Sequence, residues 1–251
     1  MNGRARHPVD ASRLSCHNYI VIDTKYQGLR EAVKKNYISI AMKRMTAPTR
    51  SRGRPREFDR DEALESAMRL FWDRGYEATS ISDLTKVMKI TPPALYGAFG
   101  SKKQLFLEAV ERYEQGPGCF ARQALAEEST AERSMRRLLL GAMKSFTAPK
   151  DPKGCLAVLG ATNCALDSAD VSQALIDRRR LAEDAVRARI TAGKNAGELA
   201  DNADVDALTG MMTALLYGLA LKARDGATRS QLRRIVEQSM AMWPRRPTAP
   251  R

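Results

Sequence analysis

From residue 59 onward, apolar side chains recur every three or four positions, the spacing that places them on one face of an α-helix. The first repeat consists of Leu64, Ala67, Met68 and Phe71. Asp59 and Glu62 precede it as a capping signature, and Gly75 favours the end of the helix. Because no stretch alternates apolar and polar residues as a half-buried strand would, we predict an all-α fold.

Three shorter helical patterns follow the first one. Ser80 with Asp83 begins a pattern over residues 81–88, and Thr91 caps another that ends at Gly100. A capping box at 101 and 104 begins a fourth helix, which runs to about residue 115. Four further helices are expected in the second half. One opens with residues 129 and 132, one is capped by Asp170 and reaches about 191, one covers 205–221, and the last runs from Thr228 to 243, before Pro244. A helix of small residues is expected over 155–166.

Residues 80–88, a tight turn and residues 91–99 have the length and pattern of a helix-turn-helix. Pro92 and Pro93 fit the start of the second helix, because the first backbone N–H groups of a helix have no internal partner. They would leave an apolar tip on a recognition helix. The alternative at this point is a plain helical corner inside a bundle.

Positive charge is concentrated at the start of the chain. The net charge is +13, and the first 60 residues hold 14 of the 42 Lys and Arg but only five of the 29 Asp and Glu. The segment Arg52-Gly-Arg54-Pro-Arg56 resembles an AT-hook core, in which arginines enter an A·T-rich minor groove. A solvated basic arm without a partner is the alternative.

Histidine and cysteine are scarce. The two histidines lie within the first 17 residues, and Cys16, Cys119, Cys155 and Cys164 form no CxxC pair. A zinc site is therefore not expected, and neither is an enzyme, since no Gly-rich phosphate loop or nucleophile elbow is present either. We expect no cofactor, no membrane span or signal peptide, and a cytoplasmic protein with reduced thiols. A redox role of Cys155 and Cys164 stays open.

The chain divides by pattern into four parts. Residues 1–50 are predicted to be a disordered basic extension, and translation from Met45 or Met42 is a hypothesis for the natural start. Residues 51–110 form the predicted DNA-binding domain, with the helix-turn-helix at about 80–99. Residues 111–244 are predicted to form a second helical domain, for which the family resemblance described below implies ligand binding and dimerisation, and 245–251 a disordered tail.

Residues 58–110 resemble the N-terminal domain of the tetracycline-repressor (TetR/AcrR) family of bacterial regulators. The resemblance rests on "FWDRGYEATSI", "ALYGAF" and "SKKQLF", in this order and spacing. It implies that Tyr96, Lys102 and Thr79 contact phosphates. Ser80 is a further candidate for a phosphate contact, because it stands at the N-terminus of a helix. Bases would be contacted from positions 91, 92, 94 and 97, which here are Thr91, Pro92, Ala94 and Gly97. Lys89 departs from the family, which usually has glycine in this turn. Either the lysine is left-handed, at a cost of about 1 kcal/mol, or the turn differs slightly.

The resemblance also implies a homodimer through the last two helices, about 205–223 and 229–243, on an inverted-repeat operator. A small-molecule effector would enter the second domain, and few aromatic and buried charged residues favour an apolar one. The candidate ligand-binding residues are Phe120, Phe146, Cys155, Leu159, Asn163 and Tyr217. The predicted function is a regulator, most simply a repressor released by its ligand, with a ligand-independent general or architectural DNA-binding protein as the alternative.

Overall fold

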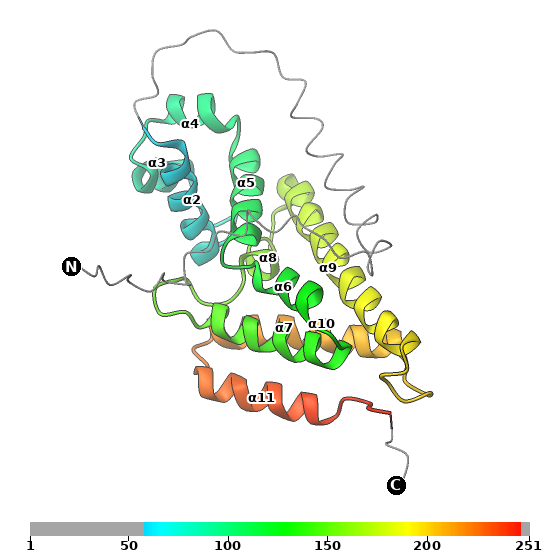
Figure 1. Cartoon of the computed structure of the whole chain (residues 1–251). Helices are drawn as coiled ribbons and strands as arrows, with labels where there is room; N and C mark the ends of the chain where they lie inside the picture. The colour runs from blue at the N-terminus through cyan, green and yellow to red at the C-terminus, as the bar shows by residue number, and fades with distance from the viewer. Residues whose placement is uncertain (1–57, 247–251) are drawn as a thin grey trace, which may run out of the picture.

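The computed structural model of the chain describes residues 58–246, and this part is helical (Figure 1). The only strand-like pairing in it is an isolated bridge between Leu199 and Arg245. The prediction of an all-α fold is therefore confirmed. Its elements are α2 (Arg60–Arg74), α3 (Ile81–Met88), α4 (Pro92–Phe99), α5 (Lys102–Gln115), α6 (Phe120–Glu127), α7 (Ala131–Phe146), α8 (Leu156–Leu159), the 3₁₀ turn η4 (Leu166–Ser168), α9 (Ala169–Asn195), α10 (Val205–Arg224) and α11 (Arg229–Ala241).

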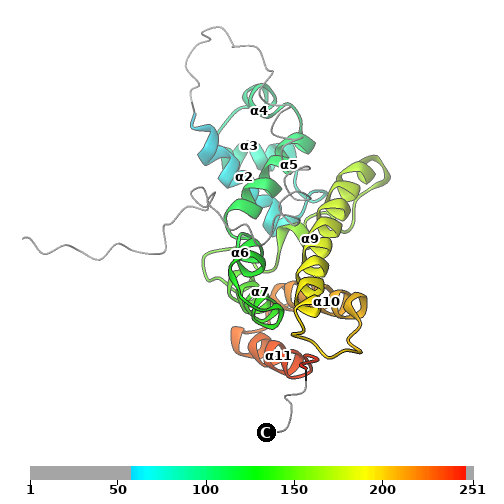
Figure 2. The same ribbon diagram turned by 45° about the vertical axis from the view of Figure 1, so that its right-hand side comes forward.

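The helices form a small head and a larger body. The head consists of α2, α3 and α4 at one end of the molecule, and α5 leads from it into the body (Figures 1 and 2). In the body, α7 packs against α6, α10 and α11, and α9 crosses α10. The helix α11 lies at the end of the molecule opposite to the head, as both views show. None of the described helices is long and apolar enough to cross a membrane.

Local capping chemistry sets most helix starts. The side chains of Asp59, Thr91 and Ser101 each accept a hydrogen bond from the first turn of the following helix. Ser80 with Asp83, and Thr228 with Gln231, form complete capping boxes. These are the positions at which the sequence predicts helix starts, because a cap depends on residues only two or three positions apart.

Three predicted boundaries are wrong. Thr130 rather than Ser129 caps α7, and α9 begins at Ala169 after Ser168. The predicted helix over 155–166 is a single turn, Leu156–Leu159. It stops because the carbonyl of Gly160 accepts a hydrogen bond from the backbone N–H of Tyr76 at 2.7 Å, which turns the chain toward the head. The four residues of α8 are therefore followed by turns and η4 instead of more helix.

The sequence analysis missed α6. Its N-cap residue, Cys119, makes no capping hydrogen bond through its side chain, and the preceding Gly-Pro-Gly indicates a break. Packing against α7 holds the helix instead. The ring of Phe120 meets that of Phe146 edge-on with centroids 5.8 Å apart, directly beside Gly141, where a Cβ atom would come within 3.0 Å of Phe120.

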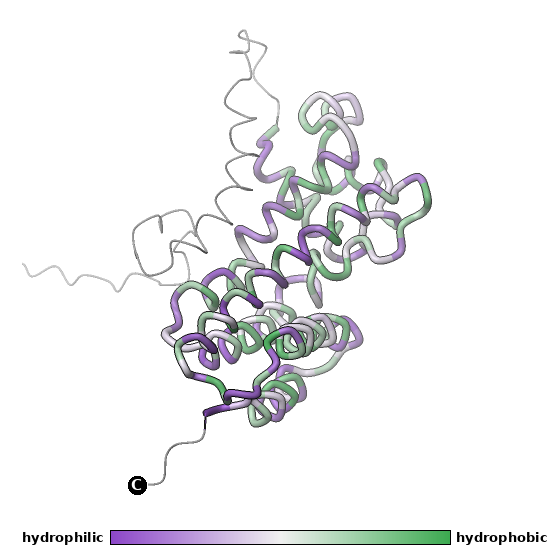
Figure 3. The backbone as a smooth tube through the Cα atoms, turned by 90° about the vertical axis from the view of Figure 1, so that its right-hand side faces the viewer, coloured by the Kyte–Doolittle hydropathy of each residue, from purple (hydrophilic) through white to green (hydrophobic). Residues whose placement is uncertain are grey.

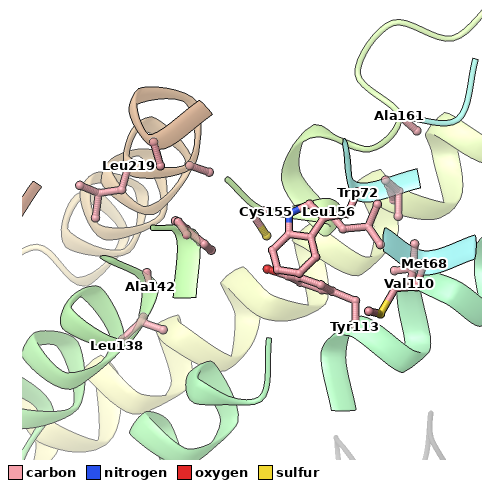
Figure 4. Packing of buried hydrophobic residues seen from close by; sticks show 14 of the residues in the cluster. Met68, Trp72, Val110, Tyr113, Leu138, Ala142, Cys155, Leu156, Ala161 and Leu219 are labelled. Atoms are coloured by element: carbon pink, nitrogen blue, oxygen red, sulfur yellow. The ribbon is translucent and has the colours of Figure 1, made fainter. Parts of the chain in front are cut away.

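Head and body share one hydrophobic core. Trp72 of α2 is fully buried, with its ring centroid 4.7 Å from that of Tyr113 on α5. Its indole N–H donates to the carbonyl of Gly154, in the loop before α8, at 3.1 Å. Figure 4 shows Trp72, Tyr113 and Leu156 meeting at this junction. Along the tube of Figure 3, apolar and polar stretches recur on the same helices, as burial of one face requires.

The predicted domain boundary between 110 and 111 falls inside a continuous helix. The helix α5 runs from Lys102 to Gln115 without interruption. Its first half packs Phe106 against Phe71 of the head at 5.0 Å between ring centroids, and its second half carries Tyr113 into the body. The helix therefore joins the two parts rigidly.

The turn between α3 and α4 contains a left-handed lysine. Lys89 has φ 55° and ψ 41°, and it is the sole non-glycine residue with positive φ in the described part of the chain. The expected strained lysine is thus present.

Lys89→Gly is expected to stabilise the protein by about 1 kcal/mol, because glycine adopts this conformation without a steric penalty. Urea unfolding would measure the gain as a higher midpoint at unchanged slope. The matched control is Lys86→Gly, inside α3, which should cost about 1 kcal/mol. A loss of stability from Lys89→Gly would mean that the lysine side chain has a structural role of its own.

Candidate nucleic-acid interface

The helices α3 and α4 form a helix-turn-helix that packs on the core through apolar residues. Leu84 and Met88 of α3 and Leu95 and Phe99 of α4 are buried in the core. Both helices have eight residues, too few for stability in isolation, so packing fixes their position.

The other face of α4 points away from the core. Thr91, Pro92, Tyr96 and Gly97 are exposed, and Ala94 is half-buried. The large side chain of Tyr96 has 47 % of its surface exposed. A Cβ atom added at Gly97 would meet nothing within 4 Å. The predicted base-contacting positions therefore share one free surface with the predicted phosphate-contacting tyrosine.

The N-terminus of α4 has few free donors. Pro92 and Pro93 lack backbone N–H groups, and the N–H of Ala94 is directed to the Thr91 hydroxyl at 3.4 Å. This end of α4 thus offers methyl and methylene groups with one hydroxyl, that of Thr91. Such a tip suits the C5-methyl group of thymine and the shape of a groove better than a phosphate.

The N-terminus of α5 is the better anion site of the two. Its first turn contains no acidic residue and begins with Lys102 and Lys103. The ammonium of Lys102 lies over the ring of Tyr76, 4.3 Å from its centroid. Burial lowers the pKa of Lys102, and the carboxylate of Glu77 opposes this shift. Lys103 forms an ion pair with Asp170 of α9.

Two predicted phosphate contacts do not fit the geometry as proposed. The Thr79 side chain is fully buried, and its hydroxyl donates to the carbonyl of Gly75 at 2.7 Å. The Ser80 hydroxyl is exposed but donates to the carboxylate of Asp83 at 2.6 Å. Thr79 therefore supports the turn before α3, and a contact from α3 to a phosphate is left to its backbone.

Sequence reasoning missed Arg60, which fixes α4 from behind. Its guanidinium stacks 4.4 Å from the ring centroid of Phe99 and donates to Glu108 of α5 at 2.6 Å. A further hydrogen bond of 3.4 Å reaches the carbonyl of Ala98. No local pattern reveals this role, because the partners lie 38 and 48 positions away. The arm residues Arg52, Arg54 and Arg56 lie outside the described residues.

Known proteins share this head together with the body behind it. The family profile described as "Bacterial regulatory proteins, tetR family" matches residues 63–109. The HTH-type transcriptional repressor ComR of Escherichia coli K12 is 32% identical over 196 residues, which cover 78% of this chain and 93% of ComR. The chain belongs to the TetR family. The prediction of a DNA-binding transcriptional regulator is thereby confirmed.

Two further relatives show how far the likeness to this TetR-family chain extends. BdcR, a transcriptional repressor of E. coli K12, is 26% identical and covers 72% of this chain and 86% of its own length. Among solved structures, a cysteine-substituted variant of the TetR-family regulator CifR, complexed with 26-bp double-strand operator DNA, has 39% identity and a TM-score of 0.73. The match covers 76% of this chain and all of that one.

In this TetR-family regulator, Tyr96→Phe is expected to weaken operator binding by about tenfold, because one hydrogen bond to a charged phosphate is lost. The preferred sequence should stay the same, since phosphate contacts carry no base information. Competition binding of the preferred duplex and of single-base variants at moderate salt would measure both quantities. Tyr217→Phe, in the body, serves as the matched control. Unchanged affinity of Tyr96→Phe would remove the phosphate contact from the interface.

The six predicted ligand-binding residues of this regulator are only partly brought together. Phe120 and Phe146 contact each other, and Cys155 is buried between the head and α10. Leu159 and Tyr217 are half-buried. Asn163 is exposed in the turns after α8, so its predicted role in a buried ligand site does not fit this geometry.

Tyr113, which sequence reasoning missed, gives the region a polar group. Its side chain is 1 % exposed, and its hydroxyl makes no hydrogen bond of acceptable geometry within the described part of the chain. Figure 4 shows the side chain reaching from α5 toward Cys155. Burial raises the pKa of Tyr113 well above its usual value, and burial likewise raises the pKa of the Cys155 thiol. Both groups are thus neutral near pH 7.

Proposed function

We propose that the chain is a sequence-specific repressor that binds an inverted-repeat operator in the cytoplasm as a homodimer and is released by a small apolar ligand. The observation that carries this proposal is the free face of α4, on which Tyr96 lies beside the predicted base-contacting positions. A solved relative with 39% identity is complexed with operator DNA, and ComR and BdcR are named repressors. A repressor is therefore the simplest form of regulator for this chain.

The proposed dimer uses an exposed stripe on α10. Small or apolar residues recur there every three or four positions and remain exposed: Ala207, Gly210, Ala214, Gly218 and Leu221. Added Cβ atoms at Gly210 and Gly218 would meet nothing within 4 Å. Met242, directly after the last residue of α11, is 66% exposed. Such a surface suits close packing against the same helices of a second copy.

A selection of duplexes from a random pool at physiological salt tests the proposed DNA recognition. An enriched inverted repeat with half-sites about one helical turn apart is the expected result, because two heads related by twofold symmetry read the same face of the duplex. Absence of any enriched sequence, with and without added cell extract, would favour the general DNA-binding alternative.

The proposed ligand has an apolar body and one hydrogen-bond acceptor. Phe146 and Cys155 offer apolar surroundings, and the buried Tyr113 hydroxyl offers a donor whose hydrogen-bonding capacity is not met. A carbonyl or ether oxygen on an otherwise apolar compound fits this combination.

Tyr113→Phe is expected to stabilise the free protein by about 1 kcal/mol, because it removes a buried hydroxyl that lacks a partner. Urea unfolding measures this change, with Tyr217→Phe as the half-buried control. Compounds found by thermal shift in a set of apolar ketones should bind the variant more weakly than the wild type. A loss of stability in Tyr113→Phe would mean that the hydroxyl already has an internal partner, which removes the reason for an acceptor on the ligand.

A further inference from the structure

Arg224, the last residue of α10, binds three backbone carbonyl groups at once. Its guanidinium donates to the carbonyls of Trp72 at 2.6 Å and Asp73 at 2.7 Å, both in the last turn of α2. The third hydrogen bond goes from Nε to the carbonyl of Lys153 at 2.8 Å. One side chain thus connects the proposed dimerisation helix, the loop before α8 and the first helix of the head.

The last turn of α2 needs such a donor. The final carbonyl groups of a helix have no intrahelical partner and carry the negative end of the helix dipole. Gly75 satisfies only the carbonyl of Phe71 through its backbone N–H. Of the three carbonyls that remain in this last turn, Arg224 binds those of Trp72 and Asp73. A guanidinium suits two neighbouring carbonyls because its donors form a planar fork, which an ammonium lacks.

The loop that Arg224 also binds is itself fastened to both sides. Asp151 forms an ion pair of 2.8 Å with Arg69 of α2, and the carbonyl of Gly154 accepts the Trp72 indole N–H. Gly154 has φ +84°, and a Cβ atom there would lie 2.9 Å from the carbonyl of Ala220 on α10. The last turn of α2, the loop before α8 and the end of α10 therefore meet closely at this point.

A second set of contacts reaches the head from another direction. Two hydrogen bonds join the turn after α2 to the segment after α8. The backbone N–H of Tyr76 donates to the carbonyl of Gly160 at 2.7 Å, and the backbone N–H of Ala165 donates to the carboxylate of Glu77 at 3.1 Å. A hydrogen bond with Ser168 is the main cause that lowers the pKa of Glu77. These contacts hold the head to the segment after α8, whereas Arg224 holds it to α10 itself.

We infer that Arg224 is a positioning residue for operator recognition: it fixes the head to α10 and so sets the separation at which the two heads of a dimer can bind their half-sites. This inference rests on the proposed dimeric function. Without Arg224, the head keeps its contacts with the loop before α8 and with the segment after α8 but loses its direct hydrogen bonds to α10, so it can shift relative to the dimer axis. Such a shift lowers the discrimination between correct and incorrect half-site spacing, while each head still reads its own half-site.

The test compares the selected inverted repeat with versions that carry one base pair more or less between the half-sites. One base pair changes both the separation and the rotation of the half-sites, by about a tenth of a turn. The wild type is expected to bind the altered spacings at least tenfold more weakly. In Arg224→Gln this ratio should fall by about fivefold or more, the size of a typical coupling between two sites.

Two further variants make the result specific. Arg187→Gln is the matched control, because Arg187 pairs with Asp206 and Asp184 on α10 and α9 but does not contact α2. It should keep the wild-type ratio. Arg224→Lys keeps the charge without the fork and should lose the spacing discrimination too, and it serves as the measured variant in case Arg224→Gln fails to fold.

Each outcome decides the inference. Full discrimination in both Arg224 variants overturns it and leaves the dimeric repressor standing. An equal loss of affinity for all spacings also overturns it, because that is the result of a merely structural role. A wild-type chain that binds a single half-site, with no preference for spacing, overturns the inference together with the proposed dimer.

Discussion

The double variant Gly210→Glu and Gly218→Glu is expected to be monomeric and to bind the operator at least 100-fold more weakly than the wild type. Both glycines lie on the exposed stripe of α10, where each subunit of the proposed dimer would receive two carboxylates without partners. Binding of the second head would no longer be intramolecular, and avidity of this kind contributes about 10²–10⁴ in affinity.

Light scattering would give the mass, and titration of the selected duplex the affinity. The isolated subunit should stay folded, because glutamate has a better helix propensity than glycine and both sites are open to solvent. Gly97→Glu is the matched control for mass, since Gly97 is equally open but lies on α4. A dimeric double variant would move the interface away from α10.

Removal of residues 1–57 is expected to weaken operator binding by about 100-fold at about 0.15 M salt, if Arg52, Arg54 and Arg56 each displace one counterion. The loss should apply to all sequences, apart from a smaller penalty at sites without A·T-rich flanks. The slope of log affinity against log salt should fall by about 3.

Two comparisons locate the effect in the arm. A chain that lacks only residues 1–50 keeps all three arginines and should retain nearly the full affinity. The full chain with Arg52→Gln, Arg54→Gln and Arg56→Gln should behave as the chain without residues 1–57. A large loss on removal of 1–50 would instead assign the affinity to the earlier basic residues.

The head is the part of the fold that the sequence predicts best. Its helix starts follow from caps two or three residues away, such as Ser80 with Asp83, and its buried face follows from a regular repeat. Tyr96 lies to one side of the buried face that Leu95 and Phe99 form on this short helix, and its side chain is exposed. The DNA-binding surface can therefore be predicted mainly from residues that lie close together in the sequence.

The body depends on contacts that no local pattern contains. The helix α6 exists because Phe120 packs on Phe146, and α8 ends early because Gly160 binds Tyr76, 84 positions earlier. A threonine in a turn is expected at the surface, yet Thr79 is buried and its hydroxyl donates a hydrogen bond to the carbonyl of Gly75. The roles of Arg60 and Arg224 became visible only when residues far apart in sequence were placed side by side.

The shared core around Trp72 has a consequence for how such a protein can be divided. A fragment that ends after α5 would keep the whole helix-turn-helix but would expose Trp72 and Tyr113 and lose the loop that carries Gly154. Unfolding should therefore be one cooperative transition rather than two. The head is a module in sequence but not in folding, so a functional exchange of reading heads between relatives has to carry the 150–165 segment with it.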